Sequence, residues 1–195
     1  MNKGKLFILS GQSGVGKNTI AKQMLENLDL VKIITCTTRD PRPDEIDGKD
    51  YFFLTEEDFA DKIGNNYFLE YAKVHNWHYG TPKEQAENLL NDGKNILMVI
   101  DVQGGVQIKE KMPEARLIFV KYTDGKLEDQ IRNRMKNDSS RKELTEEEIL
   151  KRIESAKKEA SYIQDYDYAV TNPDGQPEKA IEEIGGIISK EINEN

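Results

Sequence analysis

The sequence is short of cysteine, and it has no long apolar run. Its 195 residues include one cysteine, Cys36, which excludes a framework of internal disulfides and fits a reducing compartment. The N-terminal segment has only four consecutive apolar residues, too few for a signal-peptide core, and no run approaches the roughly 20 apolar residues that span a bilayer. We therefore expect a soluble, cytoplasmic protein without a membrane partner.

Positive charge is also in deficit. The chain has 28 Lys and Arg against 36 Asp and Glu, for a net charge of −8. A broad nucleic-acid surface needs clustered cations to displace counterions from phosphates, so this balance argues against nucleic acid as a partner. Any anion-binding site must then be local. The length permits a real core, either as one domain or as one domain with inserted lobes.

Short apolar runs and helical periodicity are what the sequence does contain. Buried strands are predicted at 6–9, 95–101, 116–122 and 167–170. Helices are predicted at 17–28, at 145 to about 164, and in 175–192; the second begins with a capping box formed by Thr145 and Glu148. Strands that alternate with helices at this spacing predict an α/β fold, with a parallel sheet covered by helices on both faces.

The segment 36–94 breaks this alternation. It begins with a stretch rich in proline and charge, continues with a short helix opened by Thr55, and ends in a second capping box, from Thr81 to Glu84, before a helix that reaches Leu90. These features predict an inserted lobe of mixed α/β structure.

A glycine-rich stretch, SGQSGVGKNT at 10–19, matches the phosphate-binding pattern G-x-x-x-x-G-K. It follows a predicted strand and opens a predicted helix, so its backbone N–H groups and the helix N-terminus can hold phosphate oxygens, with a lysine reaching the outer phosphates. The alternative is a tight strand-to-helix turn with no ligand. The residues predicted to bind ATP here are Gly11, Gln12, Ser13, Gly14, Val15, Gly16, Lys17, Asn18 and Thr19.

Asn18 departs from the pattern, which has Ser or Thr at this position to coordinate magnesium. An amide oxygen is still a hard oxygen donor, so Asn18 can contact the metal directly or through water, and Thr19 supplies a hydroxyl one position later. We therefore predict a working phosphate loop with an altered Mg²⁺ contact.

Five further motifs resemble the guanylate kinase family, and the resemblance covers nearly the whole chain. They are T-T-R-D-P-R-P-D-E at 37–45, D-G-K-D-Y-F-F at 47–53, F-L-E-Y at 68–71, H-Y-G-T at 78–81 and I-D-V-Q-G at 100–104. The resemblance implies a P-loop NTPase-type parallel sheet flanked by helices, with an inserted nucleotide-monophosphate lobe and a helical lid. The implied single domain, 1–195, has its core at 1–35 and 95–195, the GMP lobe at 36–94 and the lid at about 134–152.

The implied GMP phosphate site lies in the proline-stiffened loop. Arg39 and Arg42 can present planar guanidinium groups to a phosphate with little ordering cost, although a solvated basic turn has the same sequence. By the resemblance, these arginines and the tyrosines Tyr51 and Tyr79 hold the phosphate, and Glu45 orients the arginines.

The implied guanine site centres on Glu70. Guanine offers two donors on its pairing edge, and a carboxylate complements them; adenine lacks that pair and would leave the carboxylate unsatisfied. By the resemblance, Glu70 accepts from both donors, Thr35 and Thr81 meet the base, and Asp101 lies near the amino group. Without the family pattern, Glu70 could equally be an outward-facing charge on a strand.

Phosphoryl transfer depends on cations aimed at one point. By the resemblance these catalytic residues are Lys17, Arg42, Arg134 and Arg152, and Asn172 lies by the adenine of ATP. The cofactors implied are ATP and Mg²⁺, with Asn18 and Asp101 as metal contacts.

The chain departs from the family pattern at two further places. Val99 stands where the family motif D-I-D-x-Q-G has its first aspartate, which removes a carboxylate near the metal. In the lid, R-N-R-M at 132–135 replaces the short R-G-R-G turn and is followed by extra residues.

The predicted function is ATP-dependent phosphorylation of GMP, and of dGMP, to the diphosphate in purine nucleotide metabolism, by a monomer or homodimer. Two alternatives remain at this point: a catalytically weak guanylate kinase-like module that binds a protein partner, and a kinase of the same fold for another monophosphate. The retained Lys17 favours an enzyme, and Glu70, Thr35 and Thr81 favour guanine.

Overall fold

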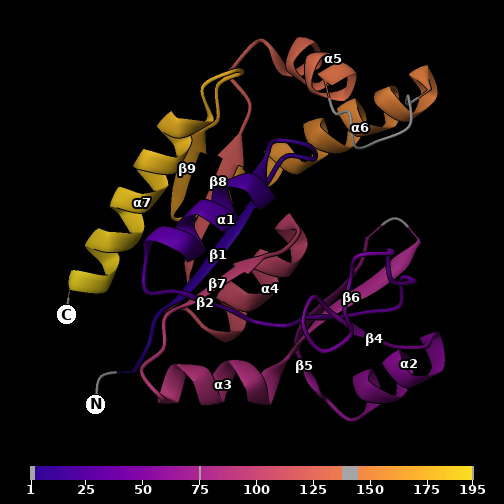
Figure 1. The fold of residues 1–195 in the computed structure, drawn as a ribbon, viewed down its shortest axis with the longest axis vertical. Coiled ribbons are helices and arrows are strands. Elements are labelled where there is room, and N and C mark those ends of the chain that lie inside the picture. The colour runs from indigo at the N-terminus through magenta and orange to yellow at the C-terminus, as the bar shows by residue number, and fades with distance from the viewer. Residues whose placement is uncertain (1–2, 75, 138–144, 195) are drawn as a thin grey trace.

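A five-stranded sheet forms the centre of the molecule (Figure 1). The computed structural model describes residues 3–74, 76–137 and 145–194, with backbone alone for 134–137. The strand order is β2-β7-β1-β8-β9, and all neighbouring strands are parallel. The strands are β1 (Leu6–Gly11), β2 (Val31–Lys32), β7 (Ile96–Val99), β8 (Arg116–Lys121) and β9 (Tyr168–Thr171). The predicted parallel α/β sheet is confirmed.

Helices cover both faces of this sheet because each central strand is apolar on both sides. On β1, Phe7 and Leu9 pack into one core, and Leu6 and Ile8 into the other. The first core is closed by α1 (Lys17–Asn27), α5 (Leu127–Asn137), α6 (Glu146–Glu159) and α7 (Pro177–Asn193). The second is closed by α3 (Lys83–Asn91) and α4 (Val102–Lys111).

A second, four-stranded sheet forms the lobe at the lower right of Figure 1. Its order is β4 (Phe52–Phe53), β3 (Cys36–Thr37), β6 (Trp77–Pro82) and β5 (Phe68–Val74), with α2 (Glu56–Gly64) packed against it. Its small core joins Cys36, Phe59 and Phe68, and the rings of the two phenylalanines stack with centroids 4.5 Å apart. The mixture of parallel and antiparallel pairs agrees with the mixed α/β lobe expected from the sequence.

Of the three helix starts that the sequence assigns to a threonine, two are confirmed. Thr55 accepts from the Asp58 N–H at 3.0 Å, and Thr145 forms the reciprocal capping box with Glu148. The box predicted at Thr81 is wrong: Thr81 still belongs to strand β6, and the N-cap position of α3 falls on Pro82, which has no side-chain acceptor. The helix predicted from 145 to about 164 is α-helical only to Glu159, and a 3₁₀ segment, η1 (Ala160–Asp165), completes it.

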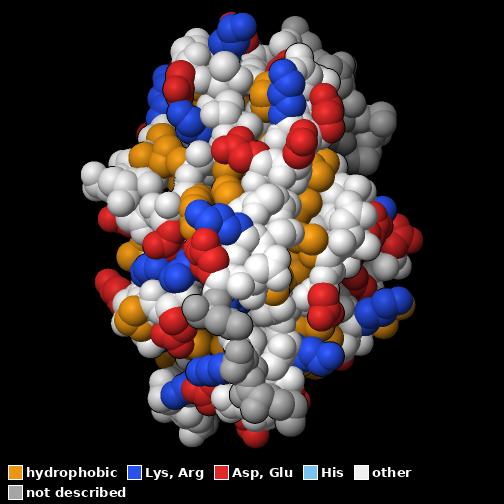
Figure 2. Space-filling model, turned by 90° about the vertical axis from the view of Figure 1, so that its left-hand side faces the viewer, with side chains coloured by type: hydrophobic (Ala, Val, Ile, Leu, Met, Phe, Trp, Pro, Cys, Tyr) orange, Lys and Arg blue, Asp and Glu red, His pale blue; other side chains and the backbone are white. Residues whose placement is uncertain are grey.

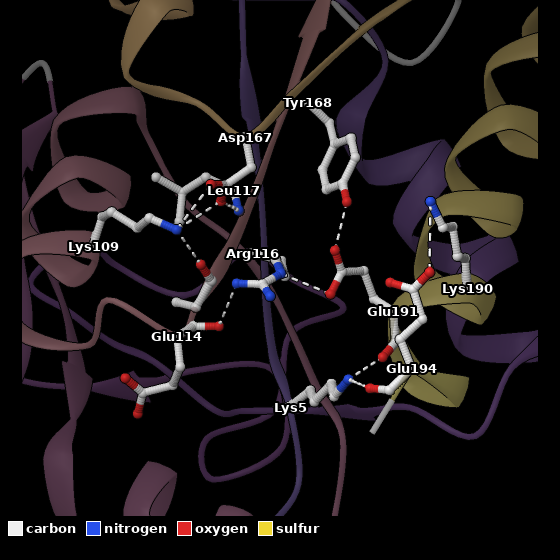
Figure 3. Close-up of polar contacts among 11 residues, drawn as sticks. Lys5, Lys109, Glu114, Arg116, Leu117, Asp167, Tyr168, Lys190, Glu191 and Glu194 are labelled. Atoms are coloured by element: carbon white, nitrogen blue, oxygen red, sulfur yellow. Dashed lines mark hydrogen bonds and ion pairs between the residues drawn. The ribbon is translucent and has the colours of Figure 1, made fainter.

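The C-terminal helix α7 is fixed by a polar network at the N-terminal edge of the main sheet (Figure 3). The buried Glu191 carboxylate accepts from Arg116 Nε at 2.7 Å and from the Tyr168 hydroxyl at 2.5 Å. Lys5 Nζ donates to the main-chain carbonyls of Glu191 and Glu194. The hydrogen bond to Glu191 and burial together raise the pKa of Tyr168 to about 12. Both strand starts are thereby tied to the last turns of α7.

Replacing Glu191 with alanine is expected to lower the free energy of unfolding by about 2 kcal/mol, because Arg116 and Tyr168 would lose their shared acceptor. Urea denaturation measures this, and Glu183→Ala, on an exposed position of the same helix, is the matched control. The kinetic constants should not change, because this network lies at the sheet edge opposite the phosphate loop. A Glu191→Ala protein as stable as the control would contradict the assignment.

The face that carries α7 has acidic and basic side chains interspersed among apolar strips (Figure 2). This mixed pattern agrees with a mean hydropathy of −0.74 for the whole chain. Across the described ranges, the structure contains no helix that is both long and apolar enough to cross a membrane.

Candidate active site

The phosphate loop joins β1 to α1 as the sequence predicts. Gly16 is the N-cap of α1 at φ 97°, a left-handed conformation that disfavours any residue with a side chain. A Cβ on Gly11 would lie 2.0 Å from the Val120 carbonyl oxygen on the neighbouring strand. Glycine is therefore required at Gly11 by close strand contact and at Gly16 by backbone conformation.

Lys17 folds back over this loop. Its Nζ donates to the Gly11 carbonyl at 2.7 Å and to the Gln12 carbonyl at 3.1 Å. Burial lowers the pKa of Lys17, while the charges of Glu159 and Asp101 act in the opposite direction. The ammonium group is thus held inside the curl of the loop, where an incoming phosphate would meet it.

The loop is supported from the protein interior by buried amide side chains. Asn172 Nδ2 donates to the Val15 carbonyl at 2.7 Å. The Gln12 side chain accepts from the Tyr122 N–H at 2.7 Å and donates to the Ala156 carbonyl at 3.1 Å. Both side chains are almost fully buried, so Gln12 and Asn172 hold the loop in shape through these contacts.

Glu70 lies in the lobe, on β5, and its carboxyl group is buried. The Thr81 hydroxyl on the paired strand β6 donates to Glu70 Oε1 at 2.6 Å. Burial raises the pKa of Glu70 to about 7, an effect that the Thr81 hydrogen bond partly offsets. A Cβ on Gly104 would come within 2.8 Å of the other oxygen, Oε2, so the glycine at this position makes room for the carboxyl group.

Asp101 caps a helix and also lines the site. It is the N-cap of α4, and its Oδ1 accepts from the Gln103 N–H at 2.8 Å and the Gly104 N–H at 3.1 Å. This cap fixes the carboxylate at the C-terminal end of β7, next to the phosphate loop on β1. Oδ2 makes neither of these capping bonds.

Arg39 and Glu45 form an ion pair in the proline-rich loop, through one guanidinium nitrogen. Arg39 Nη2 lies 2.8 Å from both Glu45 carboxylate oxygens, and the Arg42 backbone N–H donates to the same group at 2.8 Å. The Arg39 guanidinium lies 5.6 Å from the centroid of the Tyr51 ring, which is in edge contact with Tyr79. The carboxylate therefore fixes one arginine by its side chain and the other by its backbone.

One cavity of about 460 Å³ joins the phosphate loop to the lobe. It is open to solvent between the main sheet, the lobe and α6. The sequence-predicted residues with side chains along it are Ser13, Lys17, Thr35, Tyr51, Glu70, Tyr79 and Asp101. Segments far apart in the chain thus bring the phosphate loop and the buried carboxyl group to one site.

Other predicted residues lie away from this cavity. Arg42, Asn18 and Thr19 are exposed, and Arg152 is half-buried on α6. The side chain of Arg134 lies outside the described residues, as does the segment 138–144 of the predicted lid.

Ser155 and Glu159 are among the cavity residues on α6 that were not predicted from the sequence. Glu159 Oε2 accepts from the Ser13 N–H at 2.5 Å, and Glu159 Oε1 accepts from the Ser155 hydroxyl at 3.1 Å. Their i, i+4 spacing puts them on one side of the helix. Other charged residues of α6 have similar spacings, so the sequence pattern alone does not distinguish Glu159 from them.

The comparisons with known proteins agree with this geometry. The family model described as guanylate kinase matches residues 3–191. The guanylate kinase of Clostridium tetani is 42% identical over 191 residues, covering 98% of this chain and 88% of the relative. That of Fusobacterium nucleatum is 43% identical over 192 residues, covering 98% and 100%.

A solved structure gives the same result. The crystal structure of guanylate kinase from Anaplasma phagocytophilum superposes with a TM-score of 0.76 at 26% identity, covering 100% of this chain and 89% of that one. The match thus spans the main sheet, the lobe and the phosphate loop together. This chain belongs to the guanylate kinase family.

Proposed function

We propose that this protein transfers the γ-phosphoryl group of ATP to the phosphate of GMP, or dGMP, and forms the diphosphate. The observation that carries the proposal is the single cavity lined by both Lys17 of the phosphate loop and Glu70 of the lobe. A phosphate donor on the loop and a base held by Glu70 would share that cavity, so their reacting groups could meet without crossing solvent.

Glu70 is the proposed guanine acceptor. In the ionised form its two oxygens can accept from the guanine ring N–H and amino group, while Thr81 fixes the carboxylate plane through Oε1. Thr35 and Asp101, which also line the cavity, are proposed to meet the base from the side. Adenine would leave this buried acceptor unsatisfied, which supports selectivity for guanine.

The GMP phosphate is proposed to bind at Arg39, Tyr51 and Tyr79. Glu45 holds Arg39 in a fixed orientation before substrate arrives, which reduces the entropy lost on binding. Arg42, exposed in this structure, is proposed to reach the same phosphate when the lobe closes.

ATP is proposed to bind along the phosphate loop, with Lys17 at its outer phosphates and Asn172 toward the adenine end. Arg134 and Arg152 are proposed to approach from the lid, about 134–152, over the core formed by 1–35 and 95–195. Lobe residues 36–94 would close from the other side. Closure of both excludes water from the transferring group.

The donor chemistry near the loop fits magnesium carried by ATP. Magnesium is usually bound by one or two protein carboxylates together with substrate phosphates, so it needs no complete protein cage. Asp101 offers a carboxylate and Asn18 an amide oxygen; the described part of the chain has no cluster of three or more His, Cys, Asp or Glu that could replace them. When bound, Mg²⁺ would neutralise phosphate charge.

Val99 offers a direct test of this metal site. It lies at the cavity, 37% exposed, two positions before Asp101. Val99→Asp is expected to lower the Mg²⁺ concentration for half-maximal activity by about fivefold, because a second carboxylate would attract the cation. Electron paramagnetic resonance of Mn²⁺ with a non-hydrolysable ATP analogue gives a readout independent of turnover. Val99→Asn controls for polarity; an equal gain in both variants would contradict the charge argument.

Glu70 also predicts a pH dependence. Its pKa of about 7 means that the carboxylate form, which can accept from guanine, becomes the minority below that pH. GMP affinity should therefore fall by about tenfold per pH unit below 7 and level off above it. Thr81→Val removes a hydrogen bond that lowers this pKa, so in this variant the midpoint of the pH dependence of GMP affinity should move to higher pH. Titration of GMP itself cannot produce that difference between variants; identical midpoints would refute the role of Glu70.

The proposed activity is tested by ADP release from ATP and Mg²⁺ with GMP, dGMP, AMP, UMP and CMP offered separately. Turnover with the two guanine nucleotides alone supports the proposal. Binding of GMP without ADP release, even with Mn²⁺, would support a binding module instead. Turnover with another monophosphate would mean that the enzyme acts on a different substrate from the one proposed.

We further propose that the protein acts in the cytoplasm, which its one buried cysteine, Cys36, supports.

A further inference from the structure

The helix α6 is bonded directly to the phosphate loop. Glu159 Oε2 accepts from the backbone N–H of Ser13 at 2.5 Å, and the Ala156 carbonyl accepts from Gln12 Nε2 at 3.1 Å. The second oxygen of Glu159 accepts from Ser155 at 3.1 Å. Both oxygens of the carboxylate are thus held, and two successive residues of the loop are tied to one helix.

A carboxylate at this position is unexpected on electrostatic grounds. The site is proposed to receive phosphate groups, and a like charge facing them is unfavourable. Glu159 nevertheless lines the cavity and is half-buried, so its charge is only partly screened. Such a group needs a compensating benefit, and the contacts suggest one: Glu159 satisfies a loop N–H and lies near the ammonium group of Lys17.

We infer that Glu159 is a positioning residue for ATP. By accepting from Ser13 it fixes the outer peptide of the phosphate loop, and by its charge it holds Lys17 inside the loop. The cradle is then formed before ATP arrives, and the position of α6 is coupled to it. The inference deepens the proposed function and rests on it.

The size of the effect follows from the kind of contact. A hydrogen bond between a charged carboxylate and an N–H contributes more than a neutral one, so its loss is expected to weaken affinity by about tenfold or more. Burial raises the pKa of Glu159, whereas the Ser13 N–H and the Lys17 charge lower it. The pKa of Glu159 stays above its ordinary value, so these two contacts only partly offset burial in favour of the ionised form on which the positioning role depends.

The test compares Glu159→Ala, Glu159→Gln and Ser155→Ala with a matched control, Glu154→Ala, at an exposed position of the same helix. Calorimetry measures binding of a non-hydrolysable ATP analogue without GMP. Steady-state kinetics measure KM for ATP and for GMP separately. Thermal unfolding of each free protein reports any general loss of structure.

We expect Glu159→Ala to weaken binding of the ATP analogue by about tenfold and to raise KM for ATP while leaving KM for GMP unchanged. Glu159→Gln, which keeps an acceptor without the charge, should recover part of this loss. Ser155→Ala should cost about twofold to threefold, since the Ser13 contact remains. Glu154→Ala should match the wild-type protein.

Three results would overturn the inference. Unchanged analogue affinity in Glu159→Ala, with or without a lower melting temperature, would limit Glu159 to a structural role. Tighter binding in that variant would mean that the carboxylate competes with phosphate. An equal rise in KM for ATP and in KM for GMP would indicate general disruption of the site. Absence of GMP phosphorylation by the wild-type protein would instead refute the proposed function, and the binding data would still decide the role of Glu159.

Discussion

Replacing Lys17 with methionine is expected to lower kcat by about 10³-fold, because the charge that we propose stabilises the transferring phosphate would be lost from a preorganised site. Methionine keeps the length of the side chain and much of its apolar stem, so packing in the loop should persist. The lysine donates to two loop carbonyls, of Gly11 and Gln12, which hold it at the curl where phosphate would bind. Steady-state assays of ADP formation at saturating GMP measure the effect.

The matched control is Lys22→Met, on the same helix α1. Lys22 is exposed and pairs loosely with Glu26 at 3.8 Å, so its loss should leave kcat unchanged. Circular dichroism would show that both variants are folded. If Lys17→Met retained a kcat within tenfold of the wild-type protein, the phosphate loop would not serve phosphoryl transfer in the way proposed.

Replacing Glu70 with glutamine is expected to lower kcat/KM for GMP by about 10³-fold, with KM for ATP unchanged. A glutamine amide offers one acceptor and places donors against the donors of guanine, in a buried site where water cannot compensate. Glu70 is 2% exposed, and Thr81 already uses one of its oxygens. The substitution therefore tests base recognition separately from phosphate binding.

Glu57→Gln is the control for this change, since Glu57 is exposed in the first turn of α2, on the same lobe. It should leave both kinetic constants unaffected. A loss of less than tenfold in Glu70→Gln would show that guanine is recognised elsewhere. A parallel rise in KM for ATP would point to disturbance of the whole cavity.

Most of the main sheet could be predicted from the sequence because most of its strands are marked by a local run of apolar residues. The strands β1, β7, β8 and β9 are short apolar runs, and the helices α1, α6 and α7 follow from periodicity and caps, as at Thr145. The strand β2, only Val31–Lys32, contains no such run and was not predicted. The lobe was harder, since its order depends on pairing between distant segments: β3 lies between β4 and β6. Thr81 shows the same limit. Its local pattern predicts a cap, but pairing with Glu70, eleven residues away in sequence, keeps Thr81 in strand β6.

The candidate site divides in the same way. Glycine spacing identifies the phosphate loop, because conformation at Gly16 is a local requirement. Glu70 needed the family resemblance, since burial is a property of the folded chain. Glu159 could not be found by either route: it and Glu154 are both carboxylates on α6, and only the packing of the helix against Ser13 separates them.

The most direct test of the central claim is to separate the products by anion-exchange chromatography after incubating the protein with ATP, Mg²⁺ and GMP. The account predicts that GDP and ADP form in equal amounts and that neither forms when GMP is omitted. ADP without GDP would mean that the bound phosphate is passed to water. Unchanged ATP and GMP, with both shown to bind, would mean that the cavity brings the two nucleotides together without catalysing transfer, contrary to the account.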